Sequence, residues 1–514
     1  MALIKPDDYR FMEAISALSY VNPFLPDRIQ YEREALGDAF DESKADWNLL
    51  GDDPEFHLVN TRKITERAYP LLTTLQKRLA EGVAATGSEL KLYEDTALFL
   101  IYHHYAQQFK ADIIRPKKGR TYDYFNEFFH YWELFFDIDG YDLPEKDEAA
   151  HIFACLFQVR RAFLYIFRAI IGRSKVAAHL RAAVWDSIFT HDMQRYRRSF
   201  YKRMGDFTTL IIGPTGSGKE LVANAIGQSR YIPFDTNSLT FQVDFFKTFF
   251  PINLSALPAT LVESELFGHR RGAFTGALED RKGWLEACPA EGTIFIDEIG
   301  ELDPLIQVKL LRVIQARTFQ RLGSTKTLAF KGKIVAATHR DIHADMAAGK
   351  FRKDLYYRLC SDIITTPSLY EQMRESPDVL WDLVGYIAKR IAGDENEKLA
   401  EDVKSWIKKR IGLTYDWPGN IRELEQCVRN VMIRGAYYPV TETARNPAGK
   451  RGDFVLDDVL SLEEMCRLYC RRVYAQAGSY VETARRLKVD RRTVKKYVGA
   501  KKEHSRFMEN RNRQ

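Results

Sequence analysis

One seven-residue motif, GPTGSGK at residues 213–219, constrains the fold of this chain more than any other feature of its sequence. It satisfies the pattern G-x-x-x-x-G-K, and it stands directly after the short apolar run FTTLII and before the helical run ELVANAIGQ. The glycines let backbone N–H groups curl around a phosphate, the helix N-terminus favours an anion, and Lys219 can reach the β- and γ-phosphates. The motif predicts a nucleotide-binding loop with contacts from Gly213, Pro214, Thr215, Gly216, Ser217, Gly218, Lys219 and Glu220.

A second motif, GTIFIDEIG at residues 292–300, supplies the acids that a nucleotide hydrolase needs. An apolar strand candidate ends there in Asp297 and Glu298, and two carboxylates at a buried strand end are costly unless they have a task. Because a P-loop fold places such groups there, we expect Asp297 to hold Mg²⁺ and Glu298 to orient the attacking water. A surface turn with two ordinary acids is the alternative, and the upstream loop argues against it. Together the motifs predict nucleotide binding and hydrolysis.

The rest of the chain divides by pattern into several predicted domains, as its 514 residues suggest. Apolar positions spaced by three and four predict helices at the start, strand-length apolar runs such as KIVAATH alternate with helical stretches around the loop, and helices return after Pro367. We predict a multidomain α and α/β protein with a helical, regulatory N-terminal domain (1–183), a P-loop α/β subdomain (184–366), a helical lid (367–440), a linker (441–456) and a basic helical domain (457–514).

Composition excludes several other classes of protein. With 45% hydrophobic and 28% charged residues, the chain is neither largely disordered nor a disulfide framework, and its six cysteines include no CxxC pair that would indicate a zinc site. The first residues lack the pattern of a secretion signal, and Arg160 and Arg161 interrupt the apolar stretch IFACLFQVRRAFLYIF. We therefore expect a cytoplasmic protein with reduced cysteines and no membrane span.

The predicted N-terminal domain carries no catalytic motif, but it is rich in aromatic residues. Between residues 93 and 137, 14 of 45 residues are Phe, Tyr or Trp, about 31% against 13% for the whole chain. Such a cluster either lines a ligand pocket or partner interface, or simply builds a helical core from rings. His103, His104 and His130 also lie here, but an adjacent pair and a distant third do not specify metal coordination. No sensory module is recognisable, so the signal stays unknown.

Between the two nucleotide motifs stands ESELFGHRRGAFTGA, residues 263–277, which is not a generic ATPase sequence. Its glycines permit a sharp loop, Phe274 offers an exposed apolar contact and Thr275 a small hydrogen-bonding group, a combination that favours a binding partner. The segment resembles the bacterial enhancer-binding proteins, the AAA+ activators of sigma-54 RNA polymerase, whose surface loop engages the sigma factor through a GAFTGA element. The resemblance implies sigma-54 contacts from Gly272, Ala273, Phe274, Thr275, Gly276 and Ala277.

The resemblance covers about residues 184–440 and continues motif by motif in the family's order. It implies that Asn253, in PINLSAL, pairs with Glu298 to relay the nucleotide state to the GAFTGA loop. It also implies that Thr338, in KIVAATHRDI, lies near the γ-phosphate as a sensor. Arg352 and Arg358, in FRKDLYYRL, match the family's arginine fingers, which reach the ATP of a neighbouring subunit. A planar, permanently charged guanidinium suits the charge on a transferring phosphoryl group.

Three further positions bear on the resemblance. Arg422, in WPGNIRELEQCVRN, is similar to the family's sensor II arginine and would contact ATP from the lid. Glu220 departs from the Ser or Thr that most P-loops use for magnesium, but it agrees with the family's usual GKE. At residues 367–379 the chain reads PSLYEQMRESPDV where the family has a proline- and arginine-rich PPLRER-like run, so the start of the lid is expected to differ.

The end of the chain is basic, because residues 465–514 hold 15 Lys or Arg and only 4 Asp or Glu. A surplus of positive charge on a slightly acidic body suits binding to a phosphate backbone, and a solvated charged surface is the alternative. If the tail binds double-stranded DNA, we expect contacts from Arg491, Arg492, Thr493, Lys495 and Lys496.

Three short helices are predicted in this tail. Gly478 would end the first, TARRLKV would form the second, and RRTVKKYV would be a recognition helix. Candidate caps are Ser461 with Glu464, Ser479 with Glu482, and Asp490. The unit resembles the Fis-type helix-turn-helix domain that is common at the C-terminus of these activators. A helical interaction domain is the alternative.

The patterns and the resemblance lead to one leading hypothesis and two rivals. The leading hypothesis is a bacterial, cytoplasmic transcription activator that binds an upstream DNA site, forms a homo-oligomer, a hexamer by family precedent, and uses ATP hydrolysis to remodel the closed complex of sigma-54 RNA polymerase holoenzyme. The first rival is a DNA-binding regulator whose ATPase is only an oligomerisation switch, and the intact GAFTGA element argues against it. The second is an AAA+ remodeller outside transcription, and the basic tail argues against it.

Overall fold

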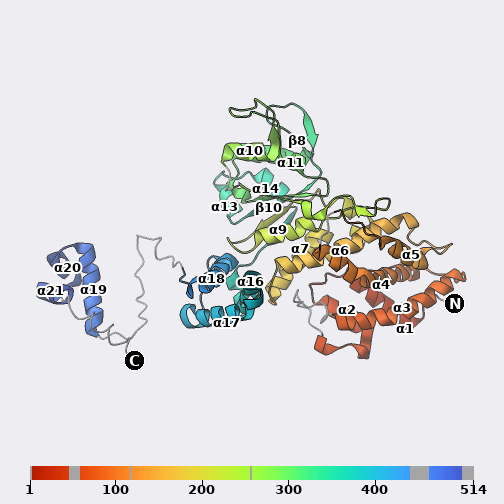
Figure 1. Ribbon diagram of the computed structural model, residues 1–514, viewed down its shortest axis with the longest axis horizontal. Coiled ribbons are helices and arrows are strands. Elements are labelled where there is room, and N and C mark those ends of the chain that lie inside the picture. The colour runs from red at the N-terminus through yellow and green to blue at the C-terminus, as the bar shows by residue number, and fades with distance from the viewer. Residues whose placement is uncertain (1–2, 45–57, 116–118, 255–257, 440–461, 500–514) are drawn as a thin grey trace. The chain divides into compact units, whose positions relative to one another are not determined.

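The computed structural model describes residues 3–44, 58–115, 119–254, 258–439 and 462–499. They belong to two compact units, Met1–Tyr438 and Pro439–Gln514 (Figure 1). The first unit has a helical N-terminal region, a parallel sheet with its helices, and a helical region after the sheet; the second unit is helical. The predicted multidomain α and α/β fold class is confirmed. The predicted linker (441–456) and Ser461 lie outside the described residues.

The N-terminal region is a bundle of helices around a long central one. Its helices are α1 (Pro6–Tyr20), α2 (Asp27–Leu36), α3 (Leu58–Ala80), α4 (Gly87–Ile114), α5 (Phe125–Phe136) and α6 (Ala149–Ala169). Helix α4 begins at a capping box, in which Thr86 Oγ1 accepts a hydrogen bond from Glu89 N and the Glu89 carboxylate accepts one from Thr86 N. It packs against α1, α3, α5 and α6, which explains why most of its side chains are buried.

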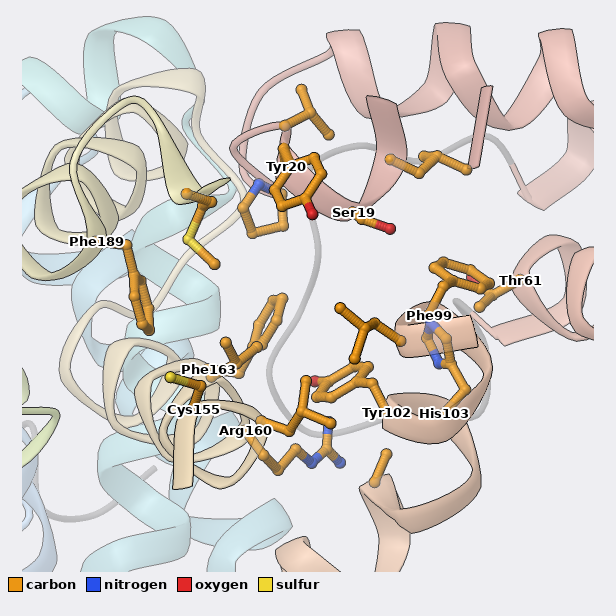
Figure 2. A pocket seen from close by; sticks show the side chains of 18 of the residues that line it. Ser19, Tyr20, Thr61, Phe99, Tyr102, His103, Cys155, Arg160, Phe163 and Phe189 are labelled. Carbon is orange, nitrogen blue, oxygen red and sulfur yellow. The ribbon is translucent and has the colours of Figure 1, made fainter. Parts of the chain in front are cut away.

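The aromatic segment mainly builds this core. Most of its rings are buried, and the hairpin of β2 (Phe234–Asp235) and β3 (Thr240–Phe241) packs against them. The centroid of the Phe125 ring lies 4.8 Å from that of Phe234, and that of Tyr122 lies 5.1 Å from that of Phe241. A minority of the segment's side chains face a cavity of about 340 Å³ among these helices (Figure 2). Both interpretations of the aromatic cluster, core and pocket wall, therefore apply.

Within the described part of the chain, one helical stretch, Lys146–Ala169, is long and apolar enough to cross a membrane, with a mean hydropathy of 1.3 over its best window. More than half of that window is buried, and α6, which makes up most of it, packs against α4, α7 and α9. These are the contacts of a core helix, and the core helix of a soluble protein passes the same length and composition test.

Two helices connect the N-terminal bundle to the sheet. They are α7 (Lys175–Phe189), which crosses the predicted boundary at residues 183 and 184, and α8 (Met193–Arg198). Side chains of α6 and α7 share one hydrophobic core with α9 and with one face of the sheet, so no gap separates the two predicted domains. The predicted boundaries stay predictions.

The central sheet is parallel and has the strand order β11-β1-β10-β7-β4. Its strands are β1 (Thr209–Ile212), β4 (Phe249–Asn253), β7 (Thr293–Asp297), β10 (Lys333–Thr338) and β11 (Asp362–Thr365). The predicted strands FTTLII, GTIFIDE and KIVAATH contain β1, β7 and β10, which are neighbours. Because parallel strands end at the same edge, the loops after these three strands meet there.

Helices and two further hairpins complete the α/β region. The helices are α9 (Lys219–Gln228), α10 (Ala259–Phe267), α11 (Trp284–Ala287), α12 (Pro304–Ala316), α13 (Ile342–Ala347) and α14 (Lys353–Leu359). The hairpins are β5 (Gly268–His269) with β6 (Arg281–Lys282), and β8 (Thr318–Gln320) with β9 (Thr327–Ala329).

The helical region after the sheet starts where the sequence departs from the family. Within PSLYEQMRESPDV, Ser368 caps α15 (Leu369–Glu375) in a capping box with Glu371. The region continues with α16 (Val379–Ala392), α17 (Asn396–Trp406), a π-helical turn (Ile407–Ile411) and α18 (Asn420–Arg434). The segment that differs from the family's sequence therefore contains the N-cap of α15.

The C-terminal unit is a three-helix cluster of α19 (Leu462–Ala477), α20 (Tyr480–Leu487) and α21 (Arg491–Gly499), each packed against the other two. Gly478, at φ 65°, follows α19 as predicted, and Asp490 Oδ1 accepts a hydrogen bond from Arg492 N at the start of α21. The predicted capping box of Ser479 with Glu482 is wrong, because the Ser479 side chain makes no capping hydrogen bond. The Glu482 carboxylate instead pairs with Arg485 and Arg486.

Candidate functional site

The loop between β1 and α9 has the backbone that phosphate binding needs. A Cβ at Gly213 would overlap Thr366, and one at Gly216 would overlap the carbonyl oxygen of Gly419. Gly218, at φ 92°, precedes the first residue of α9 in the left-handed region that favours glycine. The three glycines of the motif are therefore required by close packing and by backbone conformation, and the loop leads directly into a helix N-terminus.

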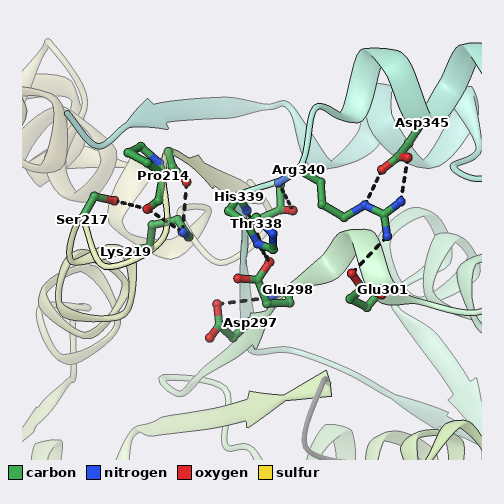
Figure 3. A network of polar contacts seen from close by, with 11 residues as sticks. Pro214, Ser217, Lys219, Asp297, Glu298, Glu301, Thr338, His339, Arg340 and Asp345 are labelled. Carbon is green, nitrogen blue, oxygen red and sulfur yellow. Dashed lines mark hydrogen bonds and ion pairs between the residues drawn. The ribbon is translucent and has the colours of Figure 1, made fainter. Parts of the chain in front are cut away.

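Lys219 is a buried amine at the centre of this loop. Its Nζ donates hydrogen bonds to the carbonyl oxygens of Gly213 (3.0 Å) and Pro214 (3.1 Å) (Figure 3). Burial lowers its pKa, the nearby carboxylates of Glu298 and Asp297 oppose that effect, and Arg422 adds to it. The predicted sensor arginine of the lid and both predicted acids thus lie within electrostatic range of this amine.

The two acids stand at the end of β7, beside β1 and β10. Burial raises the pKa of Asp297, the neighbouring Glu298 carboxylate raises it further, and Lys219 lowers it. Glu298 itself has φ 56°, a left-handed conformation that costs a non-glycine residue of the order of 1–3 kcal/mol and that clusters at functional sites. Two carboxylates beside a lysine offer the oxygen ligands that Mg²⁺ takes from proteins when phosphates supply the rest, so the residues fit this ion.

The Glu298 carboxylate has a partner that the sequence did not suggest. Its Oε2 lies 2.7 Å from His339 Nδ1 and 3.3 Å from the backbone N of the same residue (Figure 3). The next residue, Arg340, pairs with Glu301 (3.0 Å) and with Asp345 (2.7 Å). His339 directly follows the predicted sensor Thr338 in the sequence. That position is the one sequence feature that could have indicated His339 as a residue of the site.

Thr338 and Asn253 lie at the same sheet edge. Thr338 is buried, stands opposite Ile212 in the register of β10 with β1, and accepts a hydrogen bond at its carbonyl oxygen from Gly213 N (3.3 Å). Asn253 is the last residue of β4 and stands opposite Asp297. The predicted Asn253–Glu298 pairing stays a prediction; in this structure the Glu298 carboxylate bonds with His339.

The helical region after the sheet contacts the phosphate loop directly. Asn420 Nδ2 donates to the carbonyl oxygen of Thr215 (2.9 Å), and Ile421 N donates to that of Gly216 (3.1 Å). Asn420 Oδ1 also accepts from Leu369 N (2.8 Å) at the start of α15. Sequence reasoning missed Asn420, although it stands within the WPGN run two residues before Arg422.

These contacts make Gly216 a sensitive position. We expect Gly216→Ala to weaken ATP binding at least tenfold, because a side chain at φ 76° is strained by about 1–3 kcal/mol and would overlap Gly419. Isothermal titration calorimetry with ATP measures the loss. Gly385→Ala is the control: it lies within α16 with open space around a Cβ, and it should leave ATP binding unchanged. Unchanged binding by Gly216→Ala would contradict the assigned loop.

The predicted finger arginines stand apart from this site. Arg352 precedes α14 and pairs with Asp354 through two hydrogen bonds of 3.0 and 2.7 Å, and Arg358 lies near the end of the same helix. Both side chains are exposed. Among the described residues, no hydrogen bond or ion pair links either guanidinium to the phosphate loop of its own chain.

The GAFTGA residues form a compact turn at the tip of the β5–β6 hairpin. Gly272 N donates to the carbonyl oxygen of Ala277 (2.9 Å), and both glycines of the element have positive φ, 80° for Gly272 and 100° for Gly276. Phe274 is 37% exposed, and the centroid of its ring lies 5.0 Å from that of His269. The turn therefore presents an apolar ring and Thr275 at the end of a short hairpin.

The second hairpin supports this turn. Arg270 N donates to the carbonyl oxygen of Leu322 (3.0 Å), Leu322 N donates to that of Gly268 (2.9 Å), and a Cβ at Gly323 would lie 2.9 Å from Ala273 Cβ. Within the turn, Arg270 and Asp280 form an ion pair. The two hairpins are thus neighbours joined by backbone hydrogen bonds.

In the C-terminal unit the basic residues of α21 lie on one side of the helix. Val494 is buried against the other helices, whereas Arg491, Arg492, Lys495 and Lys496 are exposed and Thr493 is half-buried. Positions 491 and 495, and 492 and 496, are spaced by four residues and therefore form adjacent rows. The predicted DNA-contacting residues form one positive face.

Comparisons with known proteins agree with these features. Residues 189–365 match the family described as the Sigma-54 interaction domain. The Nif-specific regulatory protein of Azotobacter vinelandii is 42% identical over 226 residues, 44% of this chain and 40% of that protein. The transcriptional regulatory protein ZraR of Escherichia coli (strain K12) is 38% identical over 297 residues, 56% of this chain and 62% of that protein.

A crystal structure of NtrX from Brucella abortus in complex with ATP is 21% identical, with a TM-score of 0.40, and the match covers 70% of this chain and 76% of that chain. The chain thus spans about two fifths to three fifths of the length of the two curated relatives.

The phosphate loop, the acid pair and the hairpin define a P-loop α/β domain that belongs to the Sigma-54 interaction domains. Over part of its length, the chain that carries it is similar to the Nif-specific regulatory protein and to ZraR.

Proposed function

We propose that the protein is an ATP-driven activator of sigma-54 RNA polymerase that binds DNA through its C-terminal unit and acts as a homo-oligomeric ring. One observation carries the proposal: a buried lysine in a glycine loop faces two carboxylates, and the same domain carries an intact GAFTGA turn at the tip of a hairpin. The phosphate loop supports nucleotide binding, the acids support hydrolysis, and the exposed turn supports a protein contact.

The proposed reaction is ATP + H₂O to ADP and phosphate. Lys219 would pair with the β- and γ-phosphates in place of its present bonds to Gly213 and Pro214. Glu298 would orient the attacking water and take its proton, and Asp297 would hold Mg²⁺. When bound, this ion neutralises charge on the phosphate oxygens. Arg422 and Thr338 would contact the phosphates from the lid and from β10.

The proposal gives the Glu298 carboxylate two alternative partners. It bonds with His339 here, and it must turn from His339 Nδ1 toward the water for hydrolysis. Asn253 stands on the neighbouring strand β4, from which the chain continues into α10 and the GAFTGA hairpin. A change of partner at Glu298 would therefore alter the end of β4 and, through α10, the position of the turn.

The exposed finger arginines imply a shared site between subunits. Because neither contacts its own phosphate loop, they would complete the ATP site of the next subunit in a ring, where a guanidinium is worth about 10³–10⁵ in rate in related phosphoryl-transfer enzymes. The family's ring is a hexamer, and we propose the same here.

We expect Lys219→Ala and Arg358→Ala chains to be almost inactive alone and to regain ATPase activity when mixed. In a mixed ring, an Arg358→Ala subunit retains its own Lys219 and receives Arg358 from a Lys219→Ala neighbour, so about a quarter of randomly formed sites are complete. Phosphate release measures the recovery. No recovery in rings shown to have exchanged subunits would place Arg358 in its own chain's site or outside catalysis.

The positive face of α21 would contact DNA phosphates and bases. We expect Arg492→Ala to weaken binding to the protein's own upstream DNA and to lower the slope of log affinity against log salt by about 1. Fluorescence anisotropy over a salt series measures both. Arg467→Ala, on α19 and paired with Glu463, is the control and should keep the slope. An unchanged slope for Arg492→Ala would argue for the rival interpretation of a helical interaction domain.

A further inference from the structure

The cavity in the N-terminal region is separate from the nucleotide site. It has a volume of about 340 Å³ and lies among α1, α2, α3, α4, α6, α7 and α8 (Figure 2). That volume is within the range of small-molecule sites in proteins, which are concave, mostly apolar and lined by a few placed polar groups.

The wall of the cavity is mainly aromatic. Rings from three helices face it, namely Phe99, Tyr102, Phe163, Phe167, Trp185 and Phe189. Phe99 and Tyr102 come from the aromatic segment of α4, and the others come from α6 and α7, so the sequence cluster alone did not identify the site. Such a wall fits the apolar body of a ligand.

The acids of the wall are already engaged. Asp95 is buried and accepts hydrogen bonds from the Tyr20 hydroxyl and from Ser16 Oγ (2.6 Å). Glu32 forms an ion pair with Arg28 one turn earlier on α2. Neither carboxylate is left to attract a cationic ligand.

The polar groups that remain unsatisfied are donors. Arg160 Nε, Trp185 Nε1 and Arg197 Nη1 are buried without a hydrogen-bond partner, and all three residues line the cavity. A buried donor without a partner costs about 1–3 kcal/mol, so three donors around one cavity favour an acceptor within it.

Arg160 also brings a positive charge that no acid balances. Arg197 pairs with Glu94 through its other nitrogen, but no ion pair joins Arg160 to a carboxylate anywhere in the described residues. Burial lowers the pKa of His103 to about 4, and the charge of Arg160 adds to that effect, so His103 is neutral. The cavity therefore combines an apolar wall with one uncompensated cation.

We propose that this cavity binds a small apolar carboxylate, whose carboxylate group pairs with Arg160 and whose alkyl or aryl body lies against the rings of α4, α6 and α7. Arginine suits the role because its planar guanidinium binds a carboxylate through two parallel hydrogen bonds. Trp185 Nε1 is another buried donor in the wall of the same cavity.

The cavity has a direct physical connection to the phosphate loop. Trp185, Phe189 and Tyr196 line the cavity and belong to the same hydrophobic core as Val222 and Ile226 of α9. Helix α6 also packs along α9, which begins at Lys219. Since packed cores transmit strain, a ligand that orders this wall also changes α9, and the regulation of ATP hydrolysis that follows rests on the proposed function.

Calorimetry on the full chain without nucleotide tests the site. The probes are octanoate and 4-phenylbutanoate, with 1-octanol and 4-phenylbutan-1-ol as uncharged counterparts. We expect at least one acid to bind, to raise the unfolding temperature and to bind at least tenfold more tightly than its alcohol. The acid that binds more tightly identifies the body as alkyl or aryl.

Arg160→Met should lose at least tenfold in affinity for the acid. Arg168→Met, an exposed arginine on the same helix, is the matched control and should bind like the wild type. The unfolding temperature of each unliganded variant shows that it is folded, and Arg160→Lys, which keeps the charge, should retain part of the binding. No binding of either acid at millimolar concentration, equal binding of acid and alcohol, or full binding by a folded Arg160→Met would overturn the proposal.

The ATPase rate with and without the bound acid tests the connection separately. A changed rate in the wild type, absent in Arg160→Met, supports regulation through α9. Binding with an unchanged rate overturns the regulatory part and leaves the site, whereas a chain that binds the acid but hydrolyses no ATP under any condition contradicts the proposed function alone.

Discussion

Replacing Glu298 with glutamine is expected to lower the rate of ATP hydrolysis by about 10²–10⁴-fold while ATP still binds. The amide keeps the size of the side chain but cannot take a proton from water. ATP binding should persist because the glycine loop and Lys219 are unchanged, and because removing one of two adjacent carboxylates reduces charge repulsion near the phosphates. Single-turnover hydrolysis and ATP titration measure the two effects separately.

Glu301→Gln is the matched control for this substitution. Glu301 lies three residues further along the same turn and pairs with Arg340 at the surface, so its loss should change the rate by less than about threefold. A Glu298→Gln chain that hydrolyses ATP at the wild-type rate would remove Glu298 from catalysis, and His339 and Asp297 would become the groups to examine.

Replacing Thr275 with alanine is expected to separate ATP hydrolysis from sigma-54 binding. The residue lies at the hairpin tip between Phe274 and Gly276, away from Lys219 and the acid pair, so the ATPase rate should stay within about twofold. Loss of a central contact group in an interface typically costs more than about 1.4 kcal/mol, which is a tenfold loss of affinity for sigma-54. A pull-down with sigma-54 and a phosphate-release assay on the same preparation check both.

Thr74→Ala provides the matched control, because Thr74 is an exposed threonine on α3, far in sequence from the hairpin. It should retain both activities. If Thr275→Ala retained full sigma-54 binding, the turn would not be the contact surface, and the rival interpretation of an ATPase that serves only as an oligomerisation switch would gain support.

The sequence predicted the fold class and the centre of the site because both depend on short, local patterns. The glycines of GPTGSGK, between a strand and a helix, determine the backbone conformation of the loop locally. The apolar runs around Leu210, Phe295 and Val335 form adjacent buried strands. The ends of parallel strands then meet at one edge, which brings Lys219 close to Asp297 without further information.

Contacts between distant segments could not be predicted in this way. The bond from Asn420 to Thr215 joins residues 205 positions apart, and the partner of Glu298 depends on how β10 is placed beside β7. The cavity needs helices from α1 to α8, so the aromatic segment alone left core and pocket open. The capping box at Ser479 failed because Glu482 has two arginines within reach on its own helix.

Size-exclusion chromatography of the chain with sigma-54, in the presence of ADP and aluminium fluoride as a mimic of the transition state, tests the central claim most directly. The account predicts that wild-type protein elutes with sigma-54 as a ring complex only when the mimic is present, and that Thr275→Ala forms the ring but does not retain sigma-54. Rings with measurable ATPase activity that never retain sigma-54 would contradict the account.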